Sequence, residues 1–407
     1  MTDERFRLPP EVREALTRLG RAGHEAFVVG GCVRDTLMGR PVSDYDMTTS
    51  ATPDETVAAF ADCRVIETGM KHGTVTVILG GRPLEITTYR TDGAYSDGRH
   101  PDEVSFTSSL GEDLARRDFT VNAMAYHPDV GLVDRFGGLA DLDRKVIRCV
   151  GDPVRRFSED ALRILRALRF ASVLSFRIDG ETFAAASELR ENLRFVSTER
   201  VYAELSKLLR GGYAEKILLP SQMILAEAAA PLASYDADAW AAAARRVSRV
   251  PRDGAPRYAA LFWGLPEGEA ARAAELLKMD GRTKNAVLDA LRLRDVPLPE
   301  NGAAARELLR RGGADAARTA LLVRLADGDS DALDALRLVW GVLSRGEAYN
   351  VRMLAVSGRD LMEAGIPAGK SLGDTLERLL DGVIAGRLPN EKDALLRAAN
   401  PASERSV

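Results

Sequence analysis

Two aspartates near the N-terminus, Asp44 and Asp46, have the residue type and the spacing that metal-assisted chemistry needs. A short strand opening at Arg40-Pro41 would place both carboxylates on one side of a sheet, because side chains alternate between the faces of a strand. Two carboxylates at one point repel each other unless a cation lies between them, and such oxygen-rich sites suit Mg²⁺. A D-x-D pair taken alone is more often a loop or a solvated strand edge.

A glycine pair and an arginine precede the aspartates and predict the element that would face them. The apolar run Phe27–Val29 ends at Gly30-Gly31, and Val33–Met38 predicts the first turns of a helix. Glycines let backbone N–H groups approach a ligand closely, a helix start favours an anion, and Arg34 adds a charge that pairs with phosphate. A Gly-Gly after a strand is common in α/β proteins, so the pair alone is weak evidence.

The order GG, RD and D-x-D is more specific than any of its parts. The segment GGCVRDTLMGRPVSDYDMTT resembles the tRNA nucleotidyltransferase and bacterial poly(A) polymerase branch of the polymerase β-like nucleotidyltransferase superfamily. The resemblance implies that Asp44 and Asp46 are catalytic and bind two Mg²⁺ ions, and that Gly31 and Arg34 bind the nucleotide. A Rossmann oxidoreductase is disfavoured because no G-x-G-x-x-G occurs in this first unit.

Two further strands, Gly73–Leu79 and Leu84–Tyr89, are predicted around a glycine-rich hairpin signature. Glu85 points to the face opposite its apolar neighbours. The resemblance implies a third catalytic carboxylate on a strand beside the aspartates, and Glu85 is the candidate; a solvent-facing strand glutamate is an equal alternative. The polar segment 90–101 predicts a mobile loop, to which the resemblance gives a part in changing base preference during addition.

Adjacent arginines in the run DLARRDFTVNA offer a fixed fork of donors for ribose hydroxyls and phosphates. A salt-bridged helix end is the preferred alternative when the run is considered alone. RRDFTVNA, however, resembles a signature that follows D-x-D in the same family. The resemblance implies that Arg117 binds the nucleotide and that Asp118 and Asn122 lie near the sugar.

The segment Phe157–Phe170, FSEDALRILRALRF, predicts one helix with Ser158 as its N-cap. Steps of 100° place an acid followed by three arginines on one face and apolar residues on the other. Arginines at this spacing repel one another, so an anionic ligand would relieve the conflict; a solvated amphipathic face is the ordinary alternative. The polar residues of this face include Asp160, Arg163, Arg166 and Arg169.

The same segment resembles the base-selecting motif of the family. Cytosine and adenine each present an amino donor beside a ring-nitrogen acceptor on the pairing edge. Asp160 can accept from the amino group while Arg163 donates to the ring nitrogen, so one protein template would select C and A. The resemblance implies that Arg166 and Arg169 lie towards the sugar and phosphates, and we expect Glu159 to hold Arg163 in place.

The 407 residues are too many for one ordinary core, so several domains are expected. Mixed strands and helices end near residue 150, and helical periodicity dominates afterwards. We therefore predict an α+β protein. Arg200 and Glu204, near the start of a further predicted helix, are expected to have structural roles. Its predicted parts are a polymerase β-like α/β nucleotidyltransferase head (1–150), a helical neck for base selection and RNA binding (151–212), a helical body (213–330) and a helical tail for tRNA binding (331–407).

Composition excludes several classes of protein. With 45% hydrophobic and 29% charged residues the chain is globular, and its net charge of -4 argues only mildly against a nucleic-acid partner, because a local basic groove remains possible. No apolar run of membrane-spanning length occurs and the start lacks an apolar leader, so we expect no membrane partner and a cytoplasmic protein. Three cysteines without C-x-x-C spacing support neither disulfides nor zinc. No protein partner is evident, and monomer and homodimer both stay open.

Together the motifs predict an enzyme that adds CCA to the 3′ end of tRNA from CTP and ATP, releases pyrophosphate and uses Mg²⁺ as cofactor. An A-adding tRNA nucleotidyltransferase or a poly(A) polymerase shares these motifs and is the alternative, although HGTVTV looks more like the CCA enzymes. A non-catalytic RNA-binding protein is disfavoured because the carboxylates and the base-selecting residues are intact.

Overall fold

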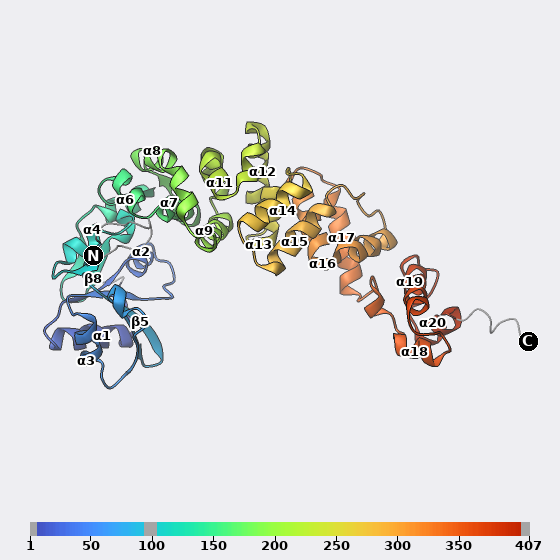
Figure 1. The fold of residues 1–407 in the computed structure, drawn as a ribbon, viewed down its shortest axis with the longest axis horizontal. Coiled ribbons are helices and arrows are strands. Elements are labelled where there is room, and N and C mark those ends of the chain that lie inside the picture. The colour runs from blue at the N-terminus through green and yellow to red at the C-terminus, as the bar shows by residue number, and fades with distance from the viewer. Residues whose placement is uncertain (1–5, 93–103, 400–407) are drawn as a thin grey trace, which may run out of the picture. The chain divides into compact units, whose positions relative to one another are not determined.

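The computed structural model describes residues 6–92 and 104–399 and divides the chain into two compact units. Unit 1 is Met1–Ala230 and unit 2 is Pro231–Val407 (Figure 1). A mixed sheet with helices forms the first part of unit 1, and the rest of the described chain is helical apart from the short strand β11 (Arg177–Ile178), which confirms the α+β prediction. The predicted loop at 90–101 falls mostly outside the described residues.

A seven-stranded sheet carries the first motifs. Its order is β3-β4-β5-β2-β1-β8-β9, with β2 and β5 parallel and the other neighbours antiparallel. All four residues of β1 are buried, so this strand is the centre of the sheet's core. The strands are β1 (Ala26–Val29), β2 (Asp46–Thr49), β3 (Arg64–Ile66), β4 (Thr74–Leu79), β5 (Arg82–Thr88), β8 (Met124–His127) and β9 (Gly131–Asp134).

Short helices and small sheets complete this region. Thr52 forms a capping box with Glu55 and Pro53 stands at the first helical position, so the sequence signal for α3 is confirmed. The elements are α1 (Pro10–Arg21), α2 (Gly31–Leu37), α3 (Pro53–Ala59), η2 (Met70–His72), β6 (Arg90–Asp92), β7 (Val104–Phe106), α4 (Leu110–Ala115), η3 (Thr120–Asn122), α5 (Gly138–Arg144) and β10 (Val146–Ile147).

The strand expected to open at Arg40-Pro41 is shorter than predicted. β2 begins only at Asp46, and residues 40–45 have no regular structure. β1 ends at Val29 in the glycine turn, and the pairing of β2 with β5 starts at Asp46, although β5 itself begins earlier, at Arg82. Asp44 therefore precedes the strand, and alternation along a strand does not explain its position.

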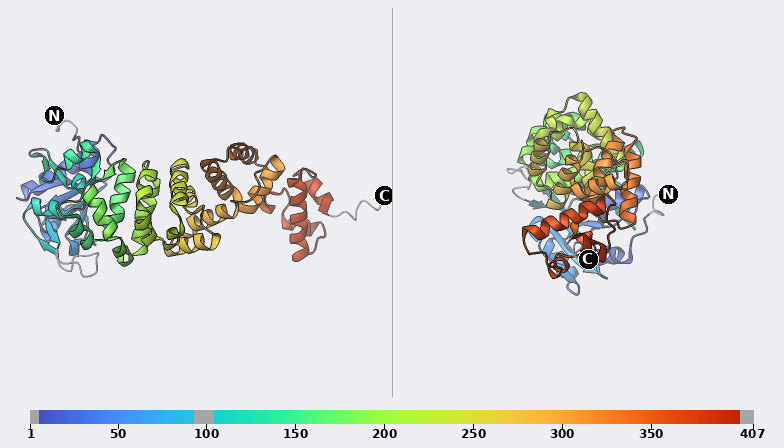
Figure 2. Two further views of the ribbon diagram at one scale, coloured as in Figure 1. Left: turned by 90° about the horizontal axis from the view of Figure 1, so that it is seen from above. Right: turned by 90° about the vertical axis from the view of Figure 1, so that its right-hand side faces the viewer.

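Helices make up the remainder of unit 1 (Figures 1 and 2). α7 and α9 pack closely: Ser172 Oγ donates a 2.8 Å hydrogen bond to the Leu208 carbonyl, and a Cβ on Gly211 would stand 2.0 Å from that Oγ atom. The elements are α6 (Pro153–Glu159), α7 (Leu162–Leu174), β11 (Arg177–Ile178), α8 (Gly180–Glu188), η4 (Arg190–Phe195), α9 (Thr198–Arg210), α10 (Ala214–Leu218), η5 (Leu219–Ser221) and α11 (Gln222–Ala228).

The single helix predicted over Phe157–Phe170 is wrong, because the chain forms two helices there. Asp152, not Ser158, caps α6, accepting from the Val154 N–H with Pro153 at the first position. Asp160 has extended backbone, φ -142° and ψ 103°, and separates α6 from α7. The periodic pattern continued through this break, so periodicity alone did not reveal it.

Unit 2 consists of helices. α16 is kinked at Gly313, whose φ of 77° is outside the helical region. Its elements are η6 (Ala230–Ser234, starting at the unit boundary), α12 (Ala237–Arg249), α13 (Gly254–Phe262), α14 (Glu267–Leu276), α15 (Gly281–Arg292), α16 (Gly302–Ala326), α17 (Ala332–Ser344), η7 (Val351–Met353), α18 (Gly358–Glu363), α19 (Lys370–Ile384) and α20 (Lys392–Ala399).

The four-part division into head, neck, body and tail stays a prediction. The structure gives two units, with their boundary after Ala230. Among the described helices, none combines the length and the apolar character needed to cross a membrane.

Candidate active site

Asp46 and Glu85 face each other across two neighbouring strands. The parallel register of β2 and β5 pairs them directly, so their side chains lie on the same face of the sheet. Partial removal from water raises the pKa of the Asp46 carboxyl most; the negative charge of Glu85 raises it further, Arg117 lowers it, and Asp44 raises it. Three carboxylates therefore influence one point, with one arginine beside them.

Asp44 reaches this point from the irregular segment before β2, where Ser43 Oγ donates a 2.8 Å hydrogen bond to its Oδ2 atom. In the described part of the chain, no group of three or more His, Cys, Asp or Glu side chains forms a metal cage by itself. Mg²⁺ at phosphoryl-transfer sites is usually held by one or two carboxylates together with substrate phosphates. The aspartate pair fits this open kind of site.

The predicted glycine turn lies beside two arginines, Arg34 and Arg117. Gly30 has φ 78°, and a Cβ there would lie 3.4 Å from Arg117 Nη1. A Cβ on Gly31 would lie 3.6 Å from Arg34 Nη2. Both glycines thus leave room beside a guanidinium group at the start of α2, where backbone N–H groups point outwards.

Asp113, which the sequence did not single out, anchors the arginine pair. Its carboxylate is fully buried and accepts from Arg116 Nη2 at 2.7 Å, Arg117 Nη2 at 3.1 Å and Thr48 Oγ1 at 3.1 Å. Burial raises the pKa of Asp113, but the charges of Arg117 and Arg116 outweigh this and hold it below its usual value. The i, i+3 and i, i+4 spacing of these residues is the sequence signal for the contact.

A chain of hydrogen bonds links α2 to α7. Arg34 Nη1 donates to Asn122 Oδ1 at 2.6 Å, and Asn122 Nδ2 donates to Asp118 Oδ1 at 3.1 Å. Arg166 then donates to Asp118 Oδ2 from Nε at 2.9 Å and from Nη2 at 2.6 Å. Burial raises the pKa of Asp118, but Arg166 and the Asn122 hydrogen bond hold it at about 2. Hydrogen bonds therefore connect four residues that were predicted to lie near the nucleotide, namely Arg34, Asn122, Asp118 and Arg166.

The predicted base-selecting pair lies at the break between α6 and α7. Asp160 accepts from the Leu162 N–H at 3.0 Å and from Arg200 Nη2 at 3.0 Å. Arg163 is buried and donates to Glu159 Oε2 at 2.9 Å, as expected for a glutamate that holds it in place. Both side chains are preorganised by neighbours, and the structural role expected for Arg200 takes the form of a direct contact with Asp160.

The repulsion predicted among the three arginines of α7 is offset within the protein, without an anionic ligand. Each has a carboxylate partner: Arg163 pairs with Glu159 and Arg166 pairs with Asp118. Arg169 pairs with Glu204, with its Nε atom 2.7 Å from Glu204 Oε2. Sequence periodicity could not reveal these partners, because two of them come from segments far from α7 in the chain. Mutual repulsion is therefore no evidence for an anionic ligand.

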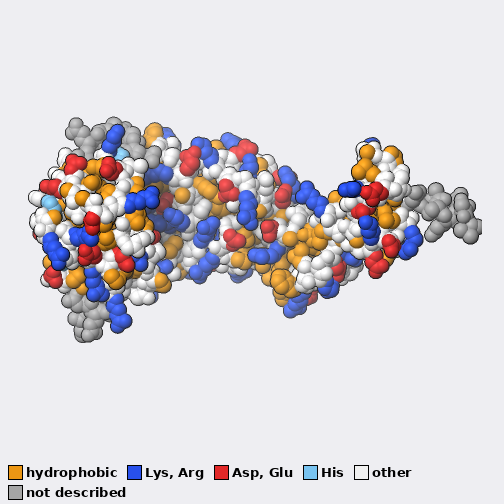
Figure 3. All heavy atoms as spheres, turned by 90° about the horizontal axis from the view of Figure 1, so that it is seen from below, with side chains coloured by type: hydrophobic (Ala, Val, Ile, Leu, Met, Phe, Trp, Pro, Cys, Tyr) orange, Lys and Arg blue, Asp and Glu red, His pale blue; other side chains and the backbone are white. Residues whose placement is uncertain are grey.

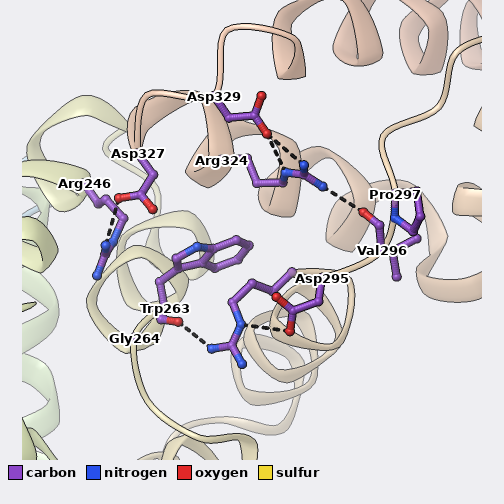
Figure 4. A pocket seen from close by; sticks show the side chains of 10 residues that line it. Arg246, Trp263, Gly264, Asp295, Val296, Pro297, Arg324, Asp327 and Asp329 are labelled. Carbon is purple, nitrogen blue, oxygen red and sulfur yellow. Dashed lines mark hydrogen bonds and ion pairs between the residues drawn. The ribbon is translucent and has the colours of Figure 1, made fainter.

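A pocket of about 580 Å³ lies entirely in unit 2, whose residues carry none of the motifs above (Figure 4). Its arginines are neutralised: Arg246 pairs with Asp327 at 2.9 Å and Arg324 with Asp329 at 2.8 Å. Figure 3 likewise shows basic and acidic side chains interspersed on the face drawn. The pocket is therefore no candidate for the predicted nucleotide chemistry.

The fold and the site define a nucleotidyltransferase with a polymerase β-like head. Family models agree with this class along the chain: "Poly A polymerase head domain" matches residues 26–148, "Probable RNA and SrmB-binding site of polymerase A" matches 175–219, and "tRNA nucleotidyltransferase domain 2 putative" matches 254–399. The CCA-adding enzyme of Levilactobacillus brevis is 38% identical over 396 residues, which are 96% of this chain and 98% of that enzyme. The chain belongs to the family of CCA-adding enzymes.

Other relatives agree along almost the whole length. The CCA-adding enzyme of Geobacillus stearothermophilus is 36% identical over 402 residues, 95% of this chain and 96% of that enzyme. The crystal structure of the Bacillus stearothermophilus CCA-adding enzyme in complex with CTP is 31% identical, with a TM-score of 0.78 over 98% of this chain and 100% of that one. The Thermotoga maritima CCA-adding enzyme complexed with tRNA-CCA, at 21% identity and a TM-score of 0.70 over 98% and 97%, supports the fold.

Proposed function

We propose that this protein adds CMP twice and then AMP to the 3′ end of tRNA, using CTP and ATP and releasing pyrophosphate. The observation that carries the proposal is the register of β2 and β5, which pairs Asp46 with Glu85 while Asp44 and Arg117 influence the same carboxyl. Family membership supports the same reaction. The roles given below to individual residues are part of the proposal.

Asp44 and Asp46 would hold Mg²⁺, and Glu85 is the third carboxylate of the site. The pKa of Asp46 is raised partly by the charges of Glu85 and Asp44, so a cation between the carboxylates would relieve their repulsion. When bound there, Mg²⁺ supplies activation of the RNA 3′-hydroxyl and charge neutralisation at the α-phosphate and the departing pyrophosphate. The open donor set leaves positions for phosphate oxygens.

Residues of the glycine turn and of α7 would bind the nucleotide. Gly31 allows the triphosphate to approach the N–H groups of α2, and Arg34 and Arg117 offer guanidinium donors beside it. Arg166 and Arg169 face the sugar and phosphates. Their connection to Arg34 through Asp118 and Asn122 supports one continuous nucleotide site.

Asp160 and Arg163 would select the base without a nucleic-acid template. The carboxylate accepts from the amino group that cytosine and adenine share, and the guanidinium donates to the adjacent ring nitrogen. Arg200 and Glu159, which bond to these two side chains, limit their rotation. Guanine and uracil present the opposite order, so they would set an acceptor against the Asp160 carboxylate and a donor against the Arg163 guanidinium.

The test is single-turnover addition with purified protein, Mg²⁺ and one nucleoside triphosphate at a time, on tRNAs that end before CCA, after C and after CC. We expect CTP to extend the first two by two residues and by one, and ATP to extend only the third, by one. Use of ATP alone would indicate an A-adding enzyme, and a long A tract would indicate a poly(A) polymerase. No addition with any triphosphate would leave only an RNA-binding role. Because tRNA is its proposed substrate, we place the enzyme in the cytoplasm.

A further inference from the structure

The phenyl ring of Phe170, on α7, has three guanidinium groups around it. The Cζ atom of Arg169 lies 3.8 Å from the ring centroid, and those of Arg34 and Arg166 lie 5.2 and 5.3 Å away. Arg34 comes from α2, next to the sheet, whereas the other two come from α7. A cation within about 6 Å of an aromatic centroid is attracted by the ring's quadrupole. One ring therefore gathers positive charges from two parts of unit 1.

The ring offers these groups a rigid surface. Phe170 is 8% exposed, and the ring of Phe119 meets it edge to face with centroids 5.7 Å apart. Such a pair favours one ring orientation, which fixes where the guanidinium groups lie. A leucine would fill part of the same volume but has no quadrupole to attract a cation.

Arg169 is the least well compensated of the three cations. Its Nε atom lies 2.7 Å from Glu204 Oε2, but neither atom makes a hydrogen bond of acceptable angle, so the ion pair is misaligned. Burial lowers the pKa of Arg169, Glu204 opposes this, and the positive charges of Arg166 and Arg34 lower it further. A buried donor with poor compensation favours an anion that approaches the cluster.

We infer that Phe170 is a positioning residue for the triphosphate of the incoming nucleotide: its ring holds Arg34, Arg166 and Arg169 at the separation that phosphate oxygens require. The ring does not itself contact the nucleotide and acts through the arginines. This inference rests on the proposed function, in which these arginines face the nucleotide. It adds a residue whose aromatic character, rather than its size, sets nucleotide affinity.

The test is steady-state CMP addition by Phe170→Leu at saturating tRNA lacking CCA, with Mg²⁺ and varied CTP. We expect KM for CTP to rise about tenfold, because several cation–π contacts are lost together, while kcat stays within about twofold of wild type. Inhibition by pyrophosphate should weaken by a similar factor, and inhibition by CMP, which lacks the β- and γ-phosphates, should not change. Phe170→Tyr keeps the ring and should restore the wild-type KM.

Phe176→Leu is the matched control. Phe176 is 1% exposed in the same unit, and no guanidinium contact to its ring is found among the described residues. This variant should lose thermal stability as Phe170→Leu does but keep the wild-type KM for CTP. If Phe170→Leu does not fold, Phe170→Met gives the same comparison without a ring.

Three outcomes would overturn the inference: an unchanged KM for CTP in the ringless variant, an equal rise in Phe176→Leu, or no recovery with Phe170→Tyr. Wild-type protein that adds no CMP would instead contradict the proposed function. If wild-type protein adds CMP and the ringless variant has a normal KM for CTP, only the positioning role of Phe170 is contradicted.

Discussion

Asp46 is the residue on which the proposed chemistry depends most directly. It begins β2, pairs with Glu85 across the sheet and is influenced by Asp44 and Arg117. Asp46→Ala should abolish nucleotide transfer, a loss of about a thousandfold or more, while tRNA binding persists because the carboxylate makes no contribution to holding RNA. Single-turnover addition and filter binding measure the two quantities. Asp129→Ala, at a 90% exposed side chain on the β8–β9 turn, is the control; near-normal transfer by Asp46→Ala would refute the catalytic assignment.

The raised pKa of Asp46 also predicts a pH-dependent stability. In the folded protein Asp46 keeps its proton at pH values where it has lost that proton in the unfolded chain. The contribution of Asp46 to the free energy of unfolding is therefore present at acid pH and is lost as pH rises through its raised pKa in the folded protein. In metal-free buffer, Asp46→Asn should therefore melt at a higher temperature than wild type near pH 8, and the difference should shrink towards pH 4.

Mg²⁺ provides the second half of this experiment. Because only the aspartate form can bind the cation strongly, Mg²⁺ near pH 8 should raise the melting temperature of wild type and leave Asp46→Asn almost unchanged. Calorimetry of both proteins with and without Mg²⁺ measures this. An equal response of the two proteins would place the metal elsewhere.

Among the elements, α7 carries the most proposed roles, and its position depends on close packing against α9. A Cβ on Gly211, just after α9, would lie 2.0 Å from Ser172 Oγ and 2.6 Å from the Ser172 carbonyl carbon. Backbone cannot move away as a flexible side chain can, so Gly211→Ala should lower the free energy of unfolding by about 2 kcal/mol.

Gly180→Ala is the control for this change, because no atom lies within 4 Å of the Cβ that it adds at the start of α8. It should change the free energy of unfolding by less than about 0.5 kcal/mol. Denaturant unfolding of wild type and both variants measures these free energies of unfolding. Equal stability of the two variants would mean that α7 and α9 separate easily.

At the scale of the whole molecule, every residue proposed for chemistry belongs to unit 1, Met1–Ala230. A fragment of these residues that retains cooperative melting should bind CTP within about threefold of the full chain, since distant independent sites contribute separately. It should bind tRNA much more weakly, because the predicted body and tail are largely absent. Calorimetric titration with CTP and filter binding with tRNA measure this; a folded fragment that does not bind CTP would show that unit 2 completes the nucleotide site.

Much of the molecule could be predicted from local pattern. The glycine turn before α2, the capped α3, the β4–β5 hairpin and the helical remainder all depend on residues close together in the chain, so the sequence determined them. The motifs around Asp44, Asp46 and the arginines of α7 likewise resemble one family, and family membership confirms the resemblance, whereas the roles of these residues stay predictions.

Tertiary structure decided what depends on contacts between distant segments. The start of β2 at Asp46 and the break at Asp160 have no counterpart in the sequence pattern, which continues on both sides of the break. Asp113 was not predicted as part of the site, although its spacing of three and four residues from Arg116 and Arg117 was a local signal for the contact. The partners of Arg166 and Arg169, and the gathering of Arg34 around Phe170, join residues far apart in the chain. Local pattern carries no information on such pairs, because packing brings them together only when the chain is folded.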